Sequence, residues 1–111
     1  MRKNLIWKEI PCSNSGDRSF HTSTLFKDYL ITYGGYSKSC DKVLSDFQIL
    51  NLKKNSFEAF NLEGDEPCSR EQHSACLIDS NKILIFAGYD GQEILHDLAL
   101  LTIQDTIRNS P

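Results

Sequence analysis

A short apolar run that ends in two small residues and a tyrosine occurs twice in this chain. Residues 29–36 read YLITYGGY, and residues 82–91 read KILIFAGYDG. Each run is rich in β-branched and aromatic residues, which favour a β-strand buried on both faces. The small pair marks a sharp turn of the main chain or its close packing against another segment. A buried strand that recurs at a fixed interval predicts a repeat unit.

Other residues recur in the same register. The separations are 51 to 53 residues, and the differences between them fall in the turns. The matched pairs are Arg18 and Arg70, His21 and His73, Gly35 and Gly88, Tyr36 and Tyr89, and Asp46 and Asp97.

Turn residues separate short alternating runs along the whole chain. The spacing between turns is typical of an all-β fold, and it places four strands in each repeat. Long polar loops follow the second strand of each repeat. We expect strands at residues 4–11, 19–26, 29–34, 46–52, 56–62, 71–78, 82–87 and 97–103, with the polar loops at 36–45 and 89–96.

This arrangement resembles the kelch repeat of β-propellers, in which about 50 residues form a four-stranded blade. The resemblance covers about residues 5–104. The second copy has Ala87 in place of the first glycine, and Phe57 replaces the usual tryptophan. The residues that carry the resemblance are Gly64, Pro67, Arg70 and His73 (G-x-x-P-x-x-R-x-x-H), Arg18 and His21, the pairs Gly34–Gly35 and Ala87–Gly88, Tyr36, Tyr89, Asp46, Asp97, and the fourth-strand aromatics Trp7 and Phe57.

The resemblance implies a kelch-type β-propeller fragment of about two four-stranded antiparallel blades. Residues 4–62 would form an N-terminal strand plus the first blade, 63–104 the second repeat, and 105–111 a polar tail. In a closed ring the N-terminal strand would complete the blade that holds strand 97–103. Two blades are not enough to close a ring alone, because propellers use about four to eight. The alternatives are missing blades in a longer parent chain or a truncated product, completion by a partner, and self-assembly.

Charge and composition limit the classes of partner that the chain is expected to bind. The net charge is −3, and the largest run of basic residues is the pair Lys53–Lys54. This pattern argues against nucleic acid or an anionic membrane as the main partner. The four cysteines are enough for two disulfides. Because the first residues do not read as a secretory signal, we expect free thiols and a cytoplasmic location.

The three histidines are expected to be structural. His21 and His73 occupy matching repeat positions, so a role in each blade is favoured over catalysis or metal binding. His96 precedes Asp97 and is expected at a turn or on the surface.

The repeat-matched arginines and aspartates have two readings. Arg18 and Arg70 could bind an acidic partner, since a guanidinium recognises carboxylates with two hydrogen bonds. The kelch resemblance instead implies that each arginine ties blade to blade through carbonyls or a nearby carboxylate. Asp46 and Asp97 are expected to cap turns. Gly34–Gly35 ends a strand but opens no helix, so a phosphate-binding loop is not expected.

The loops that follow the second and fourth strands of each repeat should emerge on one rim. These loops are 36–45, 89–96, 11–18 and 61–70. Loops on a rigid scaffold commonly carry recognition. The candidate partner-binding residues are Tyr36, Lys38, Lys42, Tyr89, Asp90, Gln92 and Glu93.

The function expected from the resemblance is a non-catalytic protein-interaction module of the scaffold or adaptor type, without a cofactor or a metal. The alternatives are a fragment of a kelch-propeller enzyme, as in galactose oxidase-like proteins, and a truncated non-functional product. The enzyme alternative requires copper ligands and a tyrosine–cysteine pair that only a whole ring would bring together.

Overall fold

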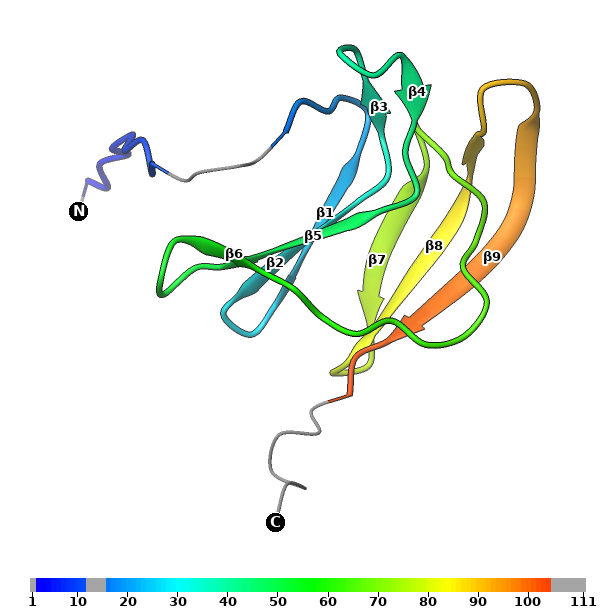
Figure 1. Ribbon diagram of the computed structural model, residues 1–111. Helices are drawn as coiled ribbons and strands as arrows, with labels where there is room; N and C mark the ends of the chain where they lie inside the picture. The colour runs from blue at the N-terminus through cyan, green and yellow to red at the C-terminus, as the bar shows by residue number, and fades with distance from the viewer. Residues whose placement is uncertain (1, 12–15, 105–111) are drawn as a thin grey trace.

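The computed structural model describes residues 2–11 and 16–104 (Figure 1). These residues form β-strands and no helix, and every strand pairing is antiparallel, so the predicted all-β class is confirmed. The strands are β1 (Thr22–Phe26), β2 (Tyr29–Tyr33), β3 (Tyr36–Ser37), β4 (Lys42–Val43), β5 (Phe47–Asn51), β6 (Ser56–Glu58), β7 (Ser74–Ile78), β8 (Lys82–Tyr89) and β9 (Ile94–Thr102).

The first blade is a four-stranded sheet in the order β1-β2-β5-β6. A tight turn joins β1 to β2, with Lys27 at a φ of 52°. β6 ends at Glu58, so it is shorter than the strand predicted at 56–62. Beyond Glu58 the chain leaves the sheet edge, and the Phe60 ring packs edge-on against Tyr29 with centroids 5.6 Å apart.

The second blade has three strands within the described residues, in the order β7-β8-β9. The prediction of a strand at 4–11 is wrong, because residues 2–11 lie outside every strand of the structure. An extended segment needs a sheet edge to satisfy its main-chain groups. This arm points away from β9, the edge strand beside which it was expected to lie (Figure 1), and Leu5 and Trp7 are 98% and 99% exposed.

The two loops that follow the small pairs are more structured than expected. The loop predicted at 36–45 contains the short β3–β4 hairpin. In the second repeat a bulge between Phe86 and Gly88 lets β8 and β9 continue to pair beyond the small pair. The loop predicted at 89–96 is therefore reduced to residues 90–93, and His96 lies exposed within β9. The predicted tail at 105–111 lies outside the described residues.

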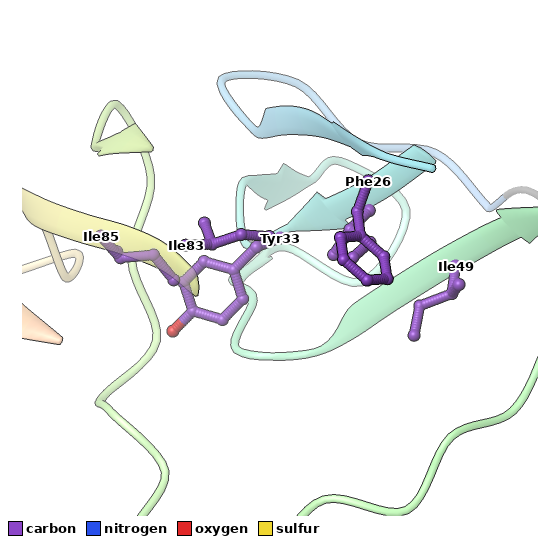
Figure 2. Packing of buried hydrophobic residues seen from close by; sticks show 6 residues of the cluster. Phe26, Tyr33, Ile49, Ile83 and Ile85 are labelled. Atoms are coloured by element: carbon purple, nitrogen blue, oxygen red, sulfur yellow. The ribbon is translucent and has the colours of Figure 1, made fainter. Parts of the chain in front are cut away.

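The hydrophobic core lies between the two blades (Figure 2). Ile31 and Tyr33 of β2 are buried against Ile83 and Ile85 of β8, and Phe26 and Ile49 join them. The alternate residues of β2, such as Leu30, are only half-buried. The organising strand of the first repeat is thus buried on one face, because no further blade among the described residues covers its other face.

Candidate functional site

Both blades bring their connecting loops to one edge, which we call the loop rim. β2 runs toward this edge and β5 runs away from it, and β8 and β9 do the same in the second blade. β1 and β7 start there, because Thr22 pairs with Tyr33 and Ser74 pairs with Phe86. The β3–β4 hairpin and the β8–β9 turn lie together at the top of Figure 1. The loop rim comprises residues 16–21, 34–46, 68–73 and 87–93.

Arg70 holds the second repeat together at this rim. Its guanidinium is fully buried and donates two hydrogen bonds of 2.8 Å to the carboxylate of Asp97. It also donates to the carbonyls of Ala87 and Cys68, at 2.9 and 3.2 Å. The hydrogen bonds that Arg70 donates to Asp97 hold the pKa of Arg70 above its usual value and that of Asp97 below its own.

Arg18 makes the matching contacts in the first repeat. It donates to the Gly34 carbonyl at 2.8 Å and to both carboxylate oxygens of Asp46, at 3.2 and 3.0 Å. The two arginines therefore tie loops within their own blade, whereas blade-to-blade contact was expected. The aspartates accept from arginine side chains, so the expected turn-capping role is replaced by an ion pair.

The blade-to-blade contacts come instead from the main chain around Arg70. The Gly35 amide donates to the Arg70 carbonyl at 2.9 Å, and the Arg70 amide donates to the Leu44 carbonyl at 3.0 Å. The Gln72 amide donates to the Phe20 carbonyl at 2.9 Å. These bonds fix the angle between the blades at the loop rim.

The glycine at the second position of each small pair permits a close crossing of two segments. A Cβ at Gly35 would lie 2.6 Å from the Ser19 carbonyl oxygen, and one at Gly88 would lie 2.8 Å from that of Glu71. Both glycines have φ values near +100°, which only glycine adopts readily. The small pairs thus mark a main-chain crossing in each blade, as the sequence suggested.

His73 reaches from the second repeat into the first blade. Its Nε2 lies 2.7 Å from the Thr22 hydroxyl, and its ring packs edge-on against Tyr33 at 5.2 Å. Burial, together with the charge of Arg70, lowers the pKa of His73 to about 4. The imidazole is therefore neutral at physiological pH, and it packs between the blades. His21, at the matching position, is exposed.

The rim loops are held rigid by their own polar contacts. The Asp17 carboxylate accepts from the hydroxyls of Ser37 and Ser39 and from the Ser39 amide, at 2.5 to 3.1 Å. These bonds lower the pKa of Asp17. The Tyr36 hydroxyl donates to Asp41, which raises the pKa of the tyrosine. The loop between β3 and β4 is thus braced at both ends.

The loop of the second blade is braced in a similar way. The Asp90 carboxylate accepts from the amides of Gln92 and Glu93, at 2.8 and 2.7 Å. These bonds lower the pKa of Asp90. Gly91 lies beside Val43, since a Cβ on it would come within 3.3 Å of that side chain. The loops of the two blades are therefore neighbours at the rim.

The seven predicted partner-binding residues separate into two groups. Lys38, Lys42, Gln92 and Glu93 are exposed. The other three are half-buried and engaged within the protein. They are Tyr36, Tyr89 and Asp90.

Two predicted rim loops are placed differently. Residues 62–67 of loop 61–70 lie against Phe47, Ile85 and the C-terminal half of β9, where they line a small cavity of about 70 Å³. Only the end of this loop, near Arg70, reaches the rim. Loop 11–18 is described from Gly16 onward, together with Pro11.

Sequence reasoning missed Asp17 and the two serines that it binds. Ser69 stands before Arg70 where Asp17 stands before Arg18, so the repeat carried no signal for this clamp. The hydroxyl-rich segment from Ser37 to Ser39 was the one hint available.

A cavity lies at the end of the blades opposite the rim. It has a volume of about 440 Å³ between β1, β2 and β5 on one side and β9 on the other. Glu63 is the one carboxylate in its described lining, which is otherwise apolar, aromatic or neutral polar. In the described ranges no group of three or more His, Cys, Asp or Glu side chains is arranged to hold a metal.

Two other general features bear on the class of protein. Cys40, Cys68 and Cys76 are free thiols, and Cys12 lies outside the described residues. Within residues 2–11 and 16–104 no helix is long and apolar enough to cross a bilayer.

Comparison with known proteins supports the propeller reading. Residues 2–108 match the family model described as the KLHDC2/KLHL20/DRC7 Kelch-repeats domain. The chain is also 34% identical over 70 residues to the leucine-zipper-like transcriptional regulator 1 of Mus musculus, and the Homo sapiens protein matches equally well. These matches cover 63% of this chain but only 8% of each relative. With the family model spanning nearly its whole length, and both repeats built alike, this chain belongs to the kelch-repeat family.

Proposed function

We propose that this chain is a non-catalytic protein-interaction module whose partner binds the loop rim. Kelch-repeat domains generally bind proteins, and both blades contribute loops to the rim. Its exposed ends carry Lys38 and Lys42 from the first blade and Glu93 from the second. Together with the exposed Asp41 of the same loop, these residues place charges of both signs close to one another, a pattern that favours oriented docking of a polar partner.

The observation that carries the proposal is the bracing of the rim loops. Three hydrogen bonds donated to Asp17 hold one loop, and two hydrogen bonds from main-chain amides to Asp90 hold the other. A loop that is already ordered loses less conformational entropy when a partner binds, so more of the contact energy appears as affinity.

Free cysteines in exposed positions accord with a reducing compartment, and we include a cytoplasmic location in the proposal. Fluorescence microscopy of the tagged full chain tests this location separately from binding. Secretion with oxidised thiols would contradict it.

The binding test uses ligands selected without bias. A displayed library of protein fragments is panned against the immobilised chain, and each binder is measured by isothermal titration calorimetry. The double variant Lys38→Glu/Lys42→Glu should weaken rim binders at least about tenfold, which corresponds to about 1.4 kcal/mol. The control is Lys54→Glu, in the β5–β6 turn at the opposite end of the blade. Binders whose affinity falls with Lys54→Glu but is unchanged by the rim double variant would refute the proposal.

A further inference from the structure

Each blade has two faces, and the internal interface uses one of each. We call the face that carries Ile31 in the first blade and Leu84 in the second the forward face. The face that carries Leu30 and Ile83 is the back face. The forward face of the first blade packs on the back face of the second, where Ile83 is 2% exposed.

The forward face of the second blade is open and apolar. Phe86, Leu98 and Leu100 are 49%, 62% and 52% exposed, and they occupy neighbouring positions on β8 and β9. Cys76 pairs with Leu84 on the same face, and it is also exposed. A contiguous apolar surface of this kind marks an interaction site more often than scattered exposed residues do.

The back face of the first blade is also open. Leu25 is 56% exposed, and Leu30 and Thr32 are half-buried. The repeat alignment matches Leu30 to Ile83 and Thr32 to Ile85, the two isoleucines buried in the internal interface. The two open faces are thus the repeat equivalents of the two faces that already pack on each other.

The polar contacts of the internal interface also have unused equivalents. His73 of the second repeat bonds Thr22 of the first blade at 2.7 Å. Its repeat match, His21, is exposed, and the match of Thr22 is Ser74, which keeps the hydroxyl and is exposed as well. Phe20 and Gln72, which flank these histidines, share the same unusual main-chain conformation, with φ values of 58° and 56°. The chain therefore presents both halves of the contact on opposite faces.

From this complementarity we propose that a second copy of this chain docks head to tail. The back face of its first blade covers the forward face of the second blade, and its His21 lies against Ser74. The two surfaces differ, so a head-to-tail pair still has one open forward face and one open back face. Further copies can therefore add until a ring closes. The occupant is a second copy because the chain itself carries the complementary face.

One substitution makes this contact looser than the internal one. A Cβ at Gly34 would lie 2.6 Å from the Arg70 carbonyl oxygen and 2.9 Å from the His73 ring, but the matching position of the second blade is Ala87. An incoming copy must therefore shift at this point to avoid the Ala87 Cβ. Thr32 in place of an isoleucine further reduces the apolar area. The assembly is accordingly weak and depends on concentration.

Sedimentation velocity of the full chain at increasing concentration tests the assembly. The wild-type mass should rise above that of the monomer. Leu98→Asp disables the forward face and Thr32→Lys the back face, so each variant alone should stay monomeric, while an equimolar mixture should form a one-to-one dimer. The control Leu52→Asp, in the β5–β6 turn, should assemble like the wild type. The proposal would be overturned if the wild type stays monomeric at every concentration, or if the mixture forms no dimer. It would also be overturned if the chain aggregates equally with and without Leu98→Asp.

Two further measurements do not depend on folding of the charged variants. Alkylation of Cys76 should slow at least several-fold at assembling concentrations, while the rim thiol of Cys40 keeps its rate. Ala87→Gly should strengthen association, because it removes the Cβ that meets the incoming copy. Equal protection of both thiols, or association unchanged by Ala87→Gly, would contradict head-to-tail docking. Neither result bears on binding of a partner at the loop rim.

Discussion

Replacement of Arg70 by methionine tests the main physical claim about the second repeat. Methionine keeps most of the unbranched side chain but removes every donor. The carbonyls of Ala87 and Cys68 and the carboxylate of Asp97 would each lose an arginine hydrogen bond. The change therefore isolates the polar contacts of a side chain that is fully buried.

The magnitude follows from the exposure of the two partners. Loss of one partner from a fully buried ion pair costs about 3–5 kcal/mol. Here Arg70 is 0% exposed but the Asp97 side chain is 49% exposed, so water solvates part of the carboxylate that is left. Two carbonyls that lose a donor add about 1 kcal/mol each when they stay dry. We expect the free energy of unfolding to fall by about 3 kcal/mol, which lowers Tm by about 15 °C for a domain of this size.

Urea denaturation followed by far-UV circular dichroism measures the change, because Trp7 is 99% exposed and reports little on folding by fluorescence. Arg18→Met should cost less, about 1–2 kcal/mol, since Asp46 is 57% exposed and Arg18 donates to one carbonyl where Arg70 donates to two. Lys54→Met, in an exposed turn, should stay within about 0.5 kcal/mol of the wild type. If Arg70→Met costs less than Arg18→Met, the reasoning from burial is refuted.

Three further predictions follow from the same geometry. The folded pKa of His73, about 4, lies below the ordinary value of 6.5, so the unfolded chain binds the proton first as the pH falls. The stability due to this group is complete above pH 6.5 and is lost toward pH 4, by about 3 kcal/mol in all. The urea midpoints of the wild type and of His73→Gln should therefore converge over this pH range, and parallel curves of midpoint against pH would count against a buried neutral imidazole. Gly88→Ala should destabilise the chain by more than about 2 kcal/mol, because the new Cβ would meet a main-chain oxygen at 2.8 Å. The control Gly64→Ala has no atom within 4 Å of its Cβ and should cost about 1 kcal/mol from its positive φ alone, so equal losses of stability in thermal melts would show that the crossing is not tight. Asp17→Ala should speed amide exchange at Ser39 several-fold in hydrogen–deuterium exchange without a large change at the buried strands, and unchanged exchange would argue against the clamp.

Local patterns were sufficient for most of the fold. The runs around Ile31 and Ile83 have few alternatives to a buried strand, because β-branched residues pack well on a pleated sheet. The regular interval between Arg18 and Arg70 then predicted two repeats, each centred on one of these strands. Positive φ and close crossing explain why Gly35 and Gly88 could be recognised from sequence as structural positions.

Contacts between distant segments could not be predicted in this way. The sequence marked Asp46 and Asp97 as repeat positions, but a turn cap and an arginine partner look alike until the loops are brought together. The rim clamp of Asp17 on Ser39 has no repeat match, so nothing in the pattern singled it out. The assignment of Tyr36 and Tyr89 to the exposed surface reflected their position in loops, whereas their main chains pair with the segments that precede β1 and β7.

The sequence by itself determined the repeat, the strand order within it and the residues that each copy shares, because these depend on local propensity and on a fixed interval. Only the tertiary structure decided which faces are covered. The arm around Trp7 alternates like a strand, yet a strand exists only where another edge accepts its hydrogen bonds, and no described strand lies beside it. In the same way Leu30 and Leu98 have the apolar character of core residues, but burial requires a neighbouring blade, and each faces the side that the two blades of this chain leave open.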